Sequence, residues 1–376
     1  MSITVPAAKS MQGNLVLYST SIKVKNLVEP GFYSIEKLDP DNKTETGYQR
    51  VLNTARARKL ADYILKGQEN KDAFLPTSIL LATDKDIHLN ESENTITISK
   101  ETEPFSVVDG QHRLEGLRMA AEKNHDILDF QVPVNIATKL DKISQMCHFL
   151  IVNTTQKSVD KGVEQRIYAR LTEMVVTEHI PSLPKWIQTI INRGEIDKAL
   201  KIVDYLNTEE NSPWNGKIQI ADHIKKGTTI KQGSFVTLLK RNFLVANNPL
   251  LALGDSEIEK KIFLNYWKAI CDLLDDNSDT VLYKYNGVDL FCKFSIPFFH
   301  KLMAADPNAF QVDRMKGELE RCFESMEGDY AGVGYPEWWH KGGIAGGMNA
   351  SALTKVVQAM AHALNRRNMT SGEITI

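Results

Sequence analysis

A buried strand that runs straight into a helix through an Asp-Gly turn is the feature that most constrains this chain. Pro104 leads into Phe105-Ser106-Val107-Val108, a short apolar run typical of a buried strand. Asp109-Gly110 follows at once, and residues 111–121 then carry the apolar spacing of a helix. This order brings a strand end beside a helix N-terminus, so the segment predicts an α/β unit.

The turn itself has the residue types of an anion site. Gly110 permits a tight turn with either sign of φ, and the helix that begins at Gln111 presents unpaired backbone N–H groups at its positive end. Arg113 adds a guanidinium suited to phosphate oxygens, and His112 can donate a hydrogen bond or exchange a proton. For Asp109 three roles stay open: metal ligand, partner of His112, or helix cap. The competing interpretation is an ordinary turn followed by surface side chains.

The pattern along the chain changes near residue 160. Before it, strands are expected over 14–25 (one or two edge strands), 77–82, 87–89, 95–98, 105–108 and 130–136, and helices over 48–66, 111–121 and 142–152. The first of these helices is expected to end at a Gly67 cap. After it, the helical period dominates over 161–206, 235–246, 257–274, 288–304, 312–326 and 350–365. We therefore expect an α/β (α+β) domain with a mixed sheet over 1–160 and a mainly helical domain over 161–376.

Composition excludes several classes of protein. The 376 residues carry 45 basic and 47 acidic side chains, so bulk electrostatics do not favour a protein that coats nucleic acid. No apolar run is long enough to span a bilayer, and the N-terminus lacks the pattern of a signal peptide. The four cysteines are widely spaced, which favours reduced, buried thiols. We expect a cytoplasmic protein without membrane contact.

The string DGQHR, in its order of elements, resembles the signature of the DGQHR-domain family, which includes the DndB and DpdB proteins of bacterial DNA-modification systems. The wider layout resembles the ParB/sulfiredoxin superfamily. It comprises Tyr48-Gln49-Arg50, the helix to Lys66, the strand after Pro76, FSVVDGQHR, VPVNI and FLIVNTTQK. The resemblance covers residues 14–165 and implies a ParB/sulfiredoxin-like nucleotide-binding domain. The nucleophilic cysteine of sulfiredoxin has no counterpart here, because Gln111 stands in that stretch.

The resemblance implies binding of ATP with Mg²⁺, and ATP hydrolysis coupled to DNA modification. DndB proteins carry Phe-x-Asp-Leu-Asn where this chain has Phe149-Leu150-Ile151-Val152-Asn153, a departure that favours a DpdB-like protein. Such a protein assists a partner transglycosylase that inserts a 7-deazaguanine into DNA. Two alternatives stay open: a DndB-like DNA-binding transcriptional regulator of a phosphorothioation system, and a ParB-like nuclease. DNA is then reached directly or through the partner enzyme, and a homodimer is compatible with each case.

The resemblance also assigns roles to individual residues. Asp109, His112 and Arg113 are the expected catalytic group, with Asp109 as the metal ligand. The expected nucleotide contacts are Gln49, Arg50, Gly110, Gln111, His112, Arg113, Asn153, Thr155, Gln156 and Lys157. Without the resemblance, the residue types alone favour a solvated helix end for residues 153–157 and a surface charge for Arg50.

Other charged and aromatic segments are less specific. Arg56, Arg58 and Lys59 are expected on a solvated helix face. Lys225, Lys226 and Lys231 form a candidate DNA contact, against the simpler interpretation of a surface loop. Trp338 and Trp339, before a glycine-rich run, either stack on a base or anchor a loop to the helical domain.

Overall fold

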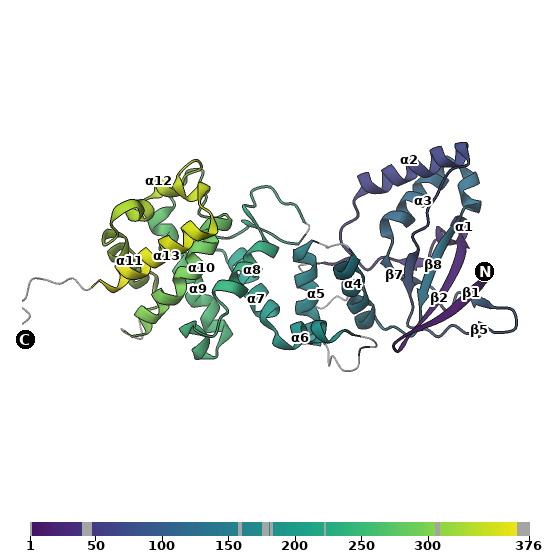
Figure 1. Ribbon diagram of the computed structural model, residues 1–376, viewed down its shortest axis with the longest axis horizontal. Coiled ribbons are helices and arrows are strands. Elements are labelled where there is room, and N and C mark those ends of the chain that lie inside the picture. Colours follow the sequence, from purple (N-terminus) through teal and green to yellow (C-terminus); the bar gives the residue numbers. More distant parts are fainter. Residues whose placement is uncertain are drawn as a thin grey trace, which may run out of the picture. The chain divides into compact units, whose positions relative to one another are not determined.

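The computed structural model divides the chain into two compact units, Met1–Arg193 and Gly194–Ile376. It describes residues 2–39, 47–156, 160–174, 180, 183–221, 223–304 and 309–366. Figure 1 shows a sheet with helices in the first unit and a mainly helical second unit. The expected mixed α/β region followed by helices is confirmed.

The first unit is built on a mixed eight-stranded sheet with the order β3-β7-β4-β8-β2-β1-β6-β5. Two of its pairs, β4 with β8 and β3 with β7, are parallel, and the remaining neighbours are antiparallel. The strands are β1 (Ile3–Gln12), β2 (Leu15–Lys23), β3 (Tyr33–Ser34), β4 (Ile79–Ala82), β5 (Leu89–Asn90), β6 (Thr95–Ile98), β7 (Phe105–Asp109) and β8 (Gln131–Ala137).

The expectation of edge strands at the N-terminal end of the chain is wrong. β2 lies inside the sheet, because β1 pairs with one side of it and β8 with the other. The pattern before Asn14 gave no clear strand signal, although Ile3–Gln12 forms a ten-residue strand. β1 thus converts the predicted edge into an interior position.

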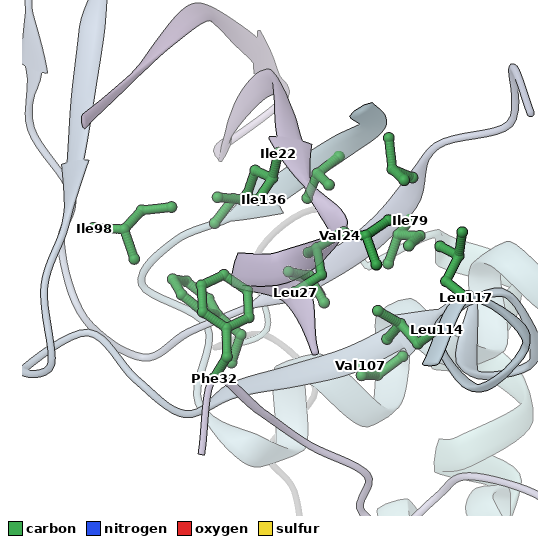
Figure 2. Packing of buried hydrophobic residues seen from close by; sticks show 14 of the residues in the cluster. Ile22, Val24, Leu27, Phe32, Ile79, Ile98, Val107, Leu114, Leu117 and Ile136 are labelled. Atoms are coloured by element: carbon green, nitrogen blue, oxygen red, sulfur yellow. The ribbon is translucent and has the colours of Figure 1, made fainter. Parts of the chain in front are cut away.

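The helices of the first unit cover both faces of the sheet. Alternate residues of a strand point to opposite faces. Val107 and Ile79 pack with Leu114 of α3 in the hydrophobic core (Figure 2), whereas Val108 and Leu80 line a cavity with residues of α4 on the other face. The helices are α1 (Val24–Leu27), α2 (Thr54–Asn70), α3 (Gln111–Lys123), α4 (Lys142–Gln156), α5 (Lys161–Met174) and α6 (Lys185–Arg193).

Two predicted helix boundaries are wrong. Gly67 lies inside α2, which continues to Asn70 and ends at Lys71 in the left-handed conformation. Gly67 is needed for a close approach instead, because a Cβ there would lie 2.7 Å from the Cα of Ala73. The first residues of the predicted helix are also non-helical, since α2 begins only after Asn53 caps it by accepting from the backbone N–H of Arg56 at 3.0 Å.

The first compact unit extends two helices beyond residue 160, where the sequence pattern changes. Its α5 is tied to the N-terminal region by Arg170, whose buried guanidinium donates to the backbone carbonyls of Gly47 and Asp39. The boundary between compact units therefore follows tertiary contacts at Arg193, whereas the predicted boundary at residue 160 follows the change in periodicity.

The second unit is helical around an aromatic core. Trp214 packs edge-on against Trp267, with ring centroids 4.9 Å apart. Trp339 is fully buried and donates from Nε1 to the carbonyl of Val333 at 2.9 Å, and Trp338 is buried too. These tryptophans anchor the loop and do not present free faces for stacking. The elements are α7 (Glu195–Thr208), β9 (Ile218–Gln219), β10 (Ile230–Lys231), α8 (Gln232–Asn242), α9 (Ser256–Leu274), α10 (Tyr285–Met303), α11 (Val312–Glu324), α12 (Pro336–Trp339) and α13 (Ala350–Asn365).

Candidate functional site

The predicted strand–turn–helix is present and has the geometry of an anion site. β7 ends at Asp109, Gly110 adopts φ +108°, and α3 begins at Gln111 with no side chain capping its N–H groups. A Cβ at Gly110 would come within 3.1 Å of Ile79 and 3.3 Å of the Arg113 guanidinium. The turn therefore requires glycine, and it leaves the positive end of α3 open to a ligand.

Two glutamines hold the segment before α2 against this turn. Gln49 is 2% exposed, and its amide nitrogen donates to the carbonyls of Val107 at 2.7 Å and Val108 at 2.9 Å. Gln111 is also buried and donates to the carbonyl of Arg50 at 3.3 Å. Both were expected to bind nucleotide, and in this structure their amide groups position Arg50 beside the start of α3.

Asp109 and Arg113 form an ion pair at the same turn. The Arg113 guanidinium donates from one Nη to Asp109 Oδ2 at 2.6 Å and to the carbonyl of Ser78 at 2.9 Å. Its buried Nε has no hydrogen-bond partner among the described residues. Of the three roles open to Asp109, the structure shows neither the helix cap nor a bond to His112, because the carboxylate engages Arg113.

His112 is a neutral histidine surrounded by cations. Its Nε2 accepts a hydrogen bond from the backbone N–H of Asn53 at 3.1 Å, which links the start of α3 to the start of α2. Burial and the neighbouring charges of Arg50 and Arg56 lower its pKa from 6.5 to about 4. Burial is the larger cause, the arginine charges add to it, and the charge of Asp109 opposes them.

A cavity of about 220 Å³ brings most of the predicted residues together. Its lining includes Gln49, Arg50, Asp109, Gly110, Gln111, His112, Arg113 and Asn153. Arg56, Leu60, Leu75, Thr77 and Phe149 complete it. Asn153 lies in the last turn of α4, where its side-chain nitrogen donates to the carbonyl of Phe149 at 2.7 Å.

Sequence reasoning missed Arg56. The helical pattern placed it with Arg58 and Lys59 on a solvated face, and its side chain is indeed exposed. It nevertheless lines the cavity, because α2 begins late and directs its first turn toward His112. The available signal was Asn53, three residues earlier, whose residue type favours the N-cap position of a helix.

The remaining candidates lie elsewhere or outside the description. Thr155 and Gln156 end α4, and only their backbone is described, while Lys157 lies outside the described residues. Lys225, Lys226 and Lys231 are exposed in the second unit, around the two-residue pairing of β9 and β10. The four cysteines are free and buried, as expected.

Asp109 is the one acidic residue among those that line the cavity, so a Mg²⁺ ion there would have a single carboxylate ligand. Mg²⁺ in nucleotide sites is commonly held by one or two carboxylates together with substrate phosphates, and this lining fits only that mode. Within the described part of the chain no cluster of three or more His, Cys, Asp or Glu residues could hold a metal. Among the same residues no helix meets the length and hydropathy of a membrane span.

The DGQHR sequence thus lies where the strand β7 of the mixed sheet meets the helix α3. Residues 5–172 match the family model DndB, described as DNA-sulfur modification-associated, so this region of the chain is similar to that family. The match favours the sulfur-modification alternative over the DpdB-like prediction, so the departure from the DndB pattern at residues 149–153 does not exclude similarity to DndB. Comparisons with curated proteins and with solved structures found no match.

Proposed function

We propose that this protein, whose residues 5–172 are similar to the DndB family, binds a nucleoside triphosphate with Mg²⁺ at the start of α3, as part of a DNA sulfur modification system. The observation that carries the proposal is the cluster of Arg50, Arg56 and Arg113 at His112, whose charges add to burial in lowering its pKa to about 4. A field that disfavours protonation of a histidine favours phosphate oxygens, and the uncapped N-terminus of α3 adds donors.

The residues have distinct roles in this proposal. Arg50, Arg56 and the backbone N–H groups at Gly110–Gln111 hold phosphate oxygens. Arg113 adds its positive charge, and its bonds to Asp109 and Ser78 fix the plane of the guanidinium. Asp109 ligates Mg²⁺ together with the phosphates. If ATP is hydrolysed, Arg113 stabilises the transferred phosphoryl group electrostatically, and His112, neutral at pH 7, accepts or donates hydrogen bonds.

The experiment compares two arginines on one helix. Binding of ATP, CTP and GTP, with and without Mg²⁺, is measured by calorimetry for the wild type, Arg56→Ala and Arg58→Ala. Arg56 lines the cavity and Arg58 does not, so Arg56→Ala should weaken binding about tenfold, or ~1.4 kcal/mol, and Arg58→Ala should leave it unchanged. Phosphate release from ATP then tests hydrolysis. A wild type that binds no triphosphate, or equal effects of the two variants, would contradict the site.

The family match favours a second candidate function, a DNA-binding regulator. Exposed Lys225 and Lys226 are its proposed phosphate contacts. Charge reversal of both, as Lys225→Glu/Lys226→Glu, should weaken duplex binding without nucleotide and reduce the slope of log K against log salt by about two. The control reverses two other exposed lysines of this unit, Lys301 and Lys355, and should not change the slope. Identical slopes for both double variants would rule out this loop as the DNA contact.

A further inference from the structure

A second, larger cavity lies on the face of the sheet that α4 covers. Its volume is about 600 Å³, within the range of about 300–1,000 Å³ that is usual for small-molecule sites. It shares Thr77, Asp109 and Arg113 with the smaller cavity at the start of α3, so the ion pair contributes to the walls of both. Its other lining residues are Gln12, Leu15, Leu17, Pro76, Ser78, Leu80, Val108, Asn135, Ala137, Leu140, His148, Ile151 and Val152.

The apolar residues of this cavity come from two opposing layers. Leu17, Leu80 and Val108 belong to the strands β2, β4 and β7, and Ile151 and Val152 belong to α4. A ligand between these layers has aliphatic side chains available to both of its faces. Such a lining suits a flat group with apolar faces.

The polar groups lie along the strand β8 and the segment before β4. The side-chain nitrogen of Asn135 donates to Ser78 Oγ at 2.9 Å, and its Oδ1 accepts from Ser19 Oγ at 2.8 Å. These bonds use one of two amide N–H groups and one of two oxygen lone pairs, so Asn135 keeps a donor and an acceptor for a ligand. Donor and acceptor side by side on one amide match the hydrogen-bonding edge of a nucleobase.

The charge of the lining favours a neutral group. Asp109 and Arg113 form an ion pair at 2.6 Å, and the other lining residues, His148 apart, carry no ionisable side chain.

We propose that the larger cavity is a nucleobase site, with the base between the sheet and α4 and its edge against Asn135 and Ser78. The base belongs either to a free nucleotide whose phosphates lie at the start of α3, or to a nucleotide extruded from DNA. The inference goes beyond the proposed function, because a DNA base can occupy the cavity whether or not a triphosphate binds.

The test fills the cavity from α4 in the full-length protein. Val152 lines the cavity and is partly exposed, so Val152→Phe occupies the space of the base without altering the residues at the start of α3. The matched control is Ile143→Phe on the same helix, at a partly exposed position that lines neither cavity. The probes are ATP, inorganic tripolyphosphate, and duplex DNA containing 2-aminopurine, whose fluorescence rises when it leaves the stack.

The two sources of the base give different results. If it belongs to the free nucleotide, Val152→Phe weakens ATP binding at least tenfold and leaves tripolyphosphate binding unchanged. If it belongs to DNA, the wild type raises 2-aminopurine fluorescence and Val152→Phe abolishes the rise. If Val152→Phe and Ile143→Phe give the same ATP affinity and the same 2-aminopurine fluorescence, the proposal is overturned. Failure of the wild type to bind tripolyphosphate counts against the anion site alone, because the DNA assay still decides the base site.

A second variant covers the case in which Val152→Phe does not fold. Ser78→Ala removes the hydroxyl beside Asn135 and keeps the bond to Arg113, which uses the backbone carbonyl of Ser78. Ser78→Ala should weaken binding several-fold for the probe to which the wild type responds, either ATP or the 2-aminopurine DNA. Tripolyphosphate binding should stay unchanged. No effect of Ser78→Ala in either assay overturns the proposal in that case.

Discussion

At the scale of single residues, His112 reports the electrostatics of the whole site. The histidine accepts from Asn53 through Nε2 and is therefore neutral in this structure. Its pKa of about 4 lies below the ordinary 6.5, chiefly because of burial and then because of Arg50 and Arg56. The neutral form of His112 therefore predominates only while the pH stays above that pKa.

The same residue predicts a pH dependence of stability. Between pH 6.5 and pH 4 the unfolded chain binds a proton at this histidine and the folded chain does not, so its contribution destabilises the fold as the pH falls through that window. Above pH 6.5 the contribution is constant. We expect the wild type to lose free energy of unfolding relative to His112→Gln as the pH is lowered from 6.5 to 4, measured by denaturant unfolding. Gln keeps an acceptor for Asn53 but does not titrate, and a difference that is constant across this window would refute the assignment.

At the scale of elements, the sequence predicts features that depend on neighbouring residues, but not those that depend on contacts between distant segments. The order β7, Gly110, α3 follows from an apolar strand, a residue that tolerates φ +108° and a helical period, all within neighbouring residues. Arg56 joins the site because α2 begins late, which Asn53 signals locally, and because α2 packs beside α3, which no local pattern specifies. In the same way, the interior position of β2 depends on its pairing with β1, a strand with a weak pattern of its own.

At the scale of the whole molecule, the extent of the first unit depends on α5. Arg170, only 6% exposed, donates to the carbonyls of Gly47 and Asp39. Gly47 begins the described segment that carries Gln49 and Arg50 to the proposed anion site. The helices after residue 160 therefore support the site from a distance, although the sequence pattern assigns them to the helical half.

This dependence predicts how shortened chains behave. Residues 1–193 should unfold cooperatively and bind a triphosphate as the full chain does, whereas residues 1–160 lack α5 and should show a lower Tm and weaker binding. In the full chain, Arg170→Ala should cost roughly 2–3 kcal/mol, because one buried and one partly buried carbonyl lose a charged donor. Lys161→Ala, an exposed position at the start of α5, is the control and should be neutral. Equal stability and affinity of the two fragments would place the functional boundary at residue 160, and would show that α5 contributes nothing to the position of Arg50.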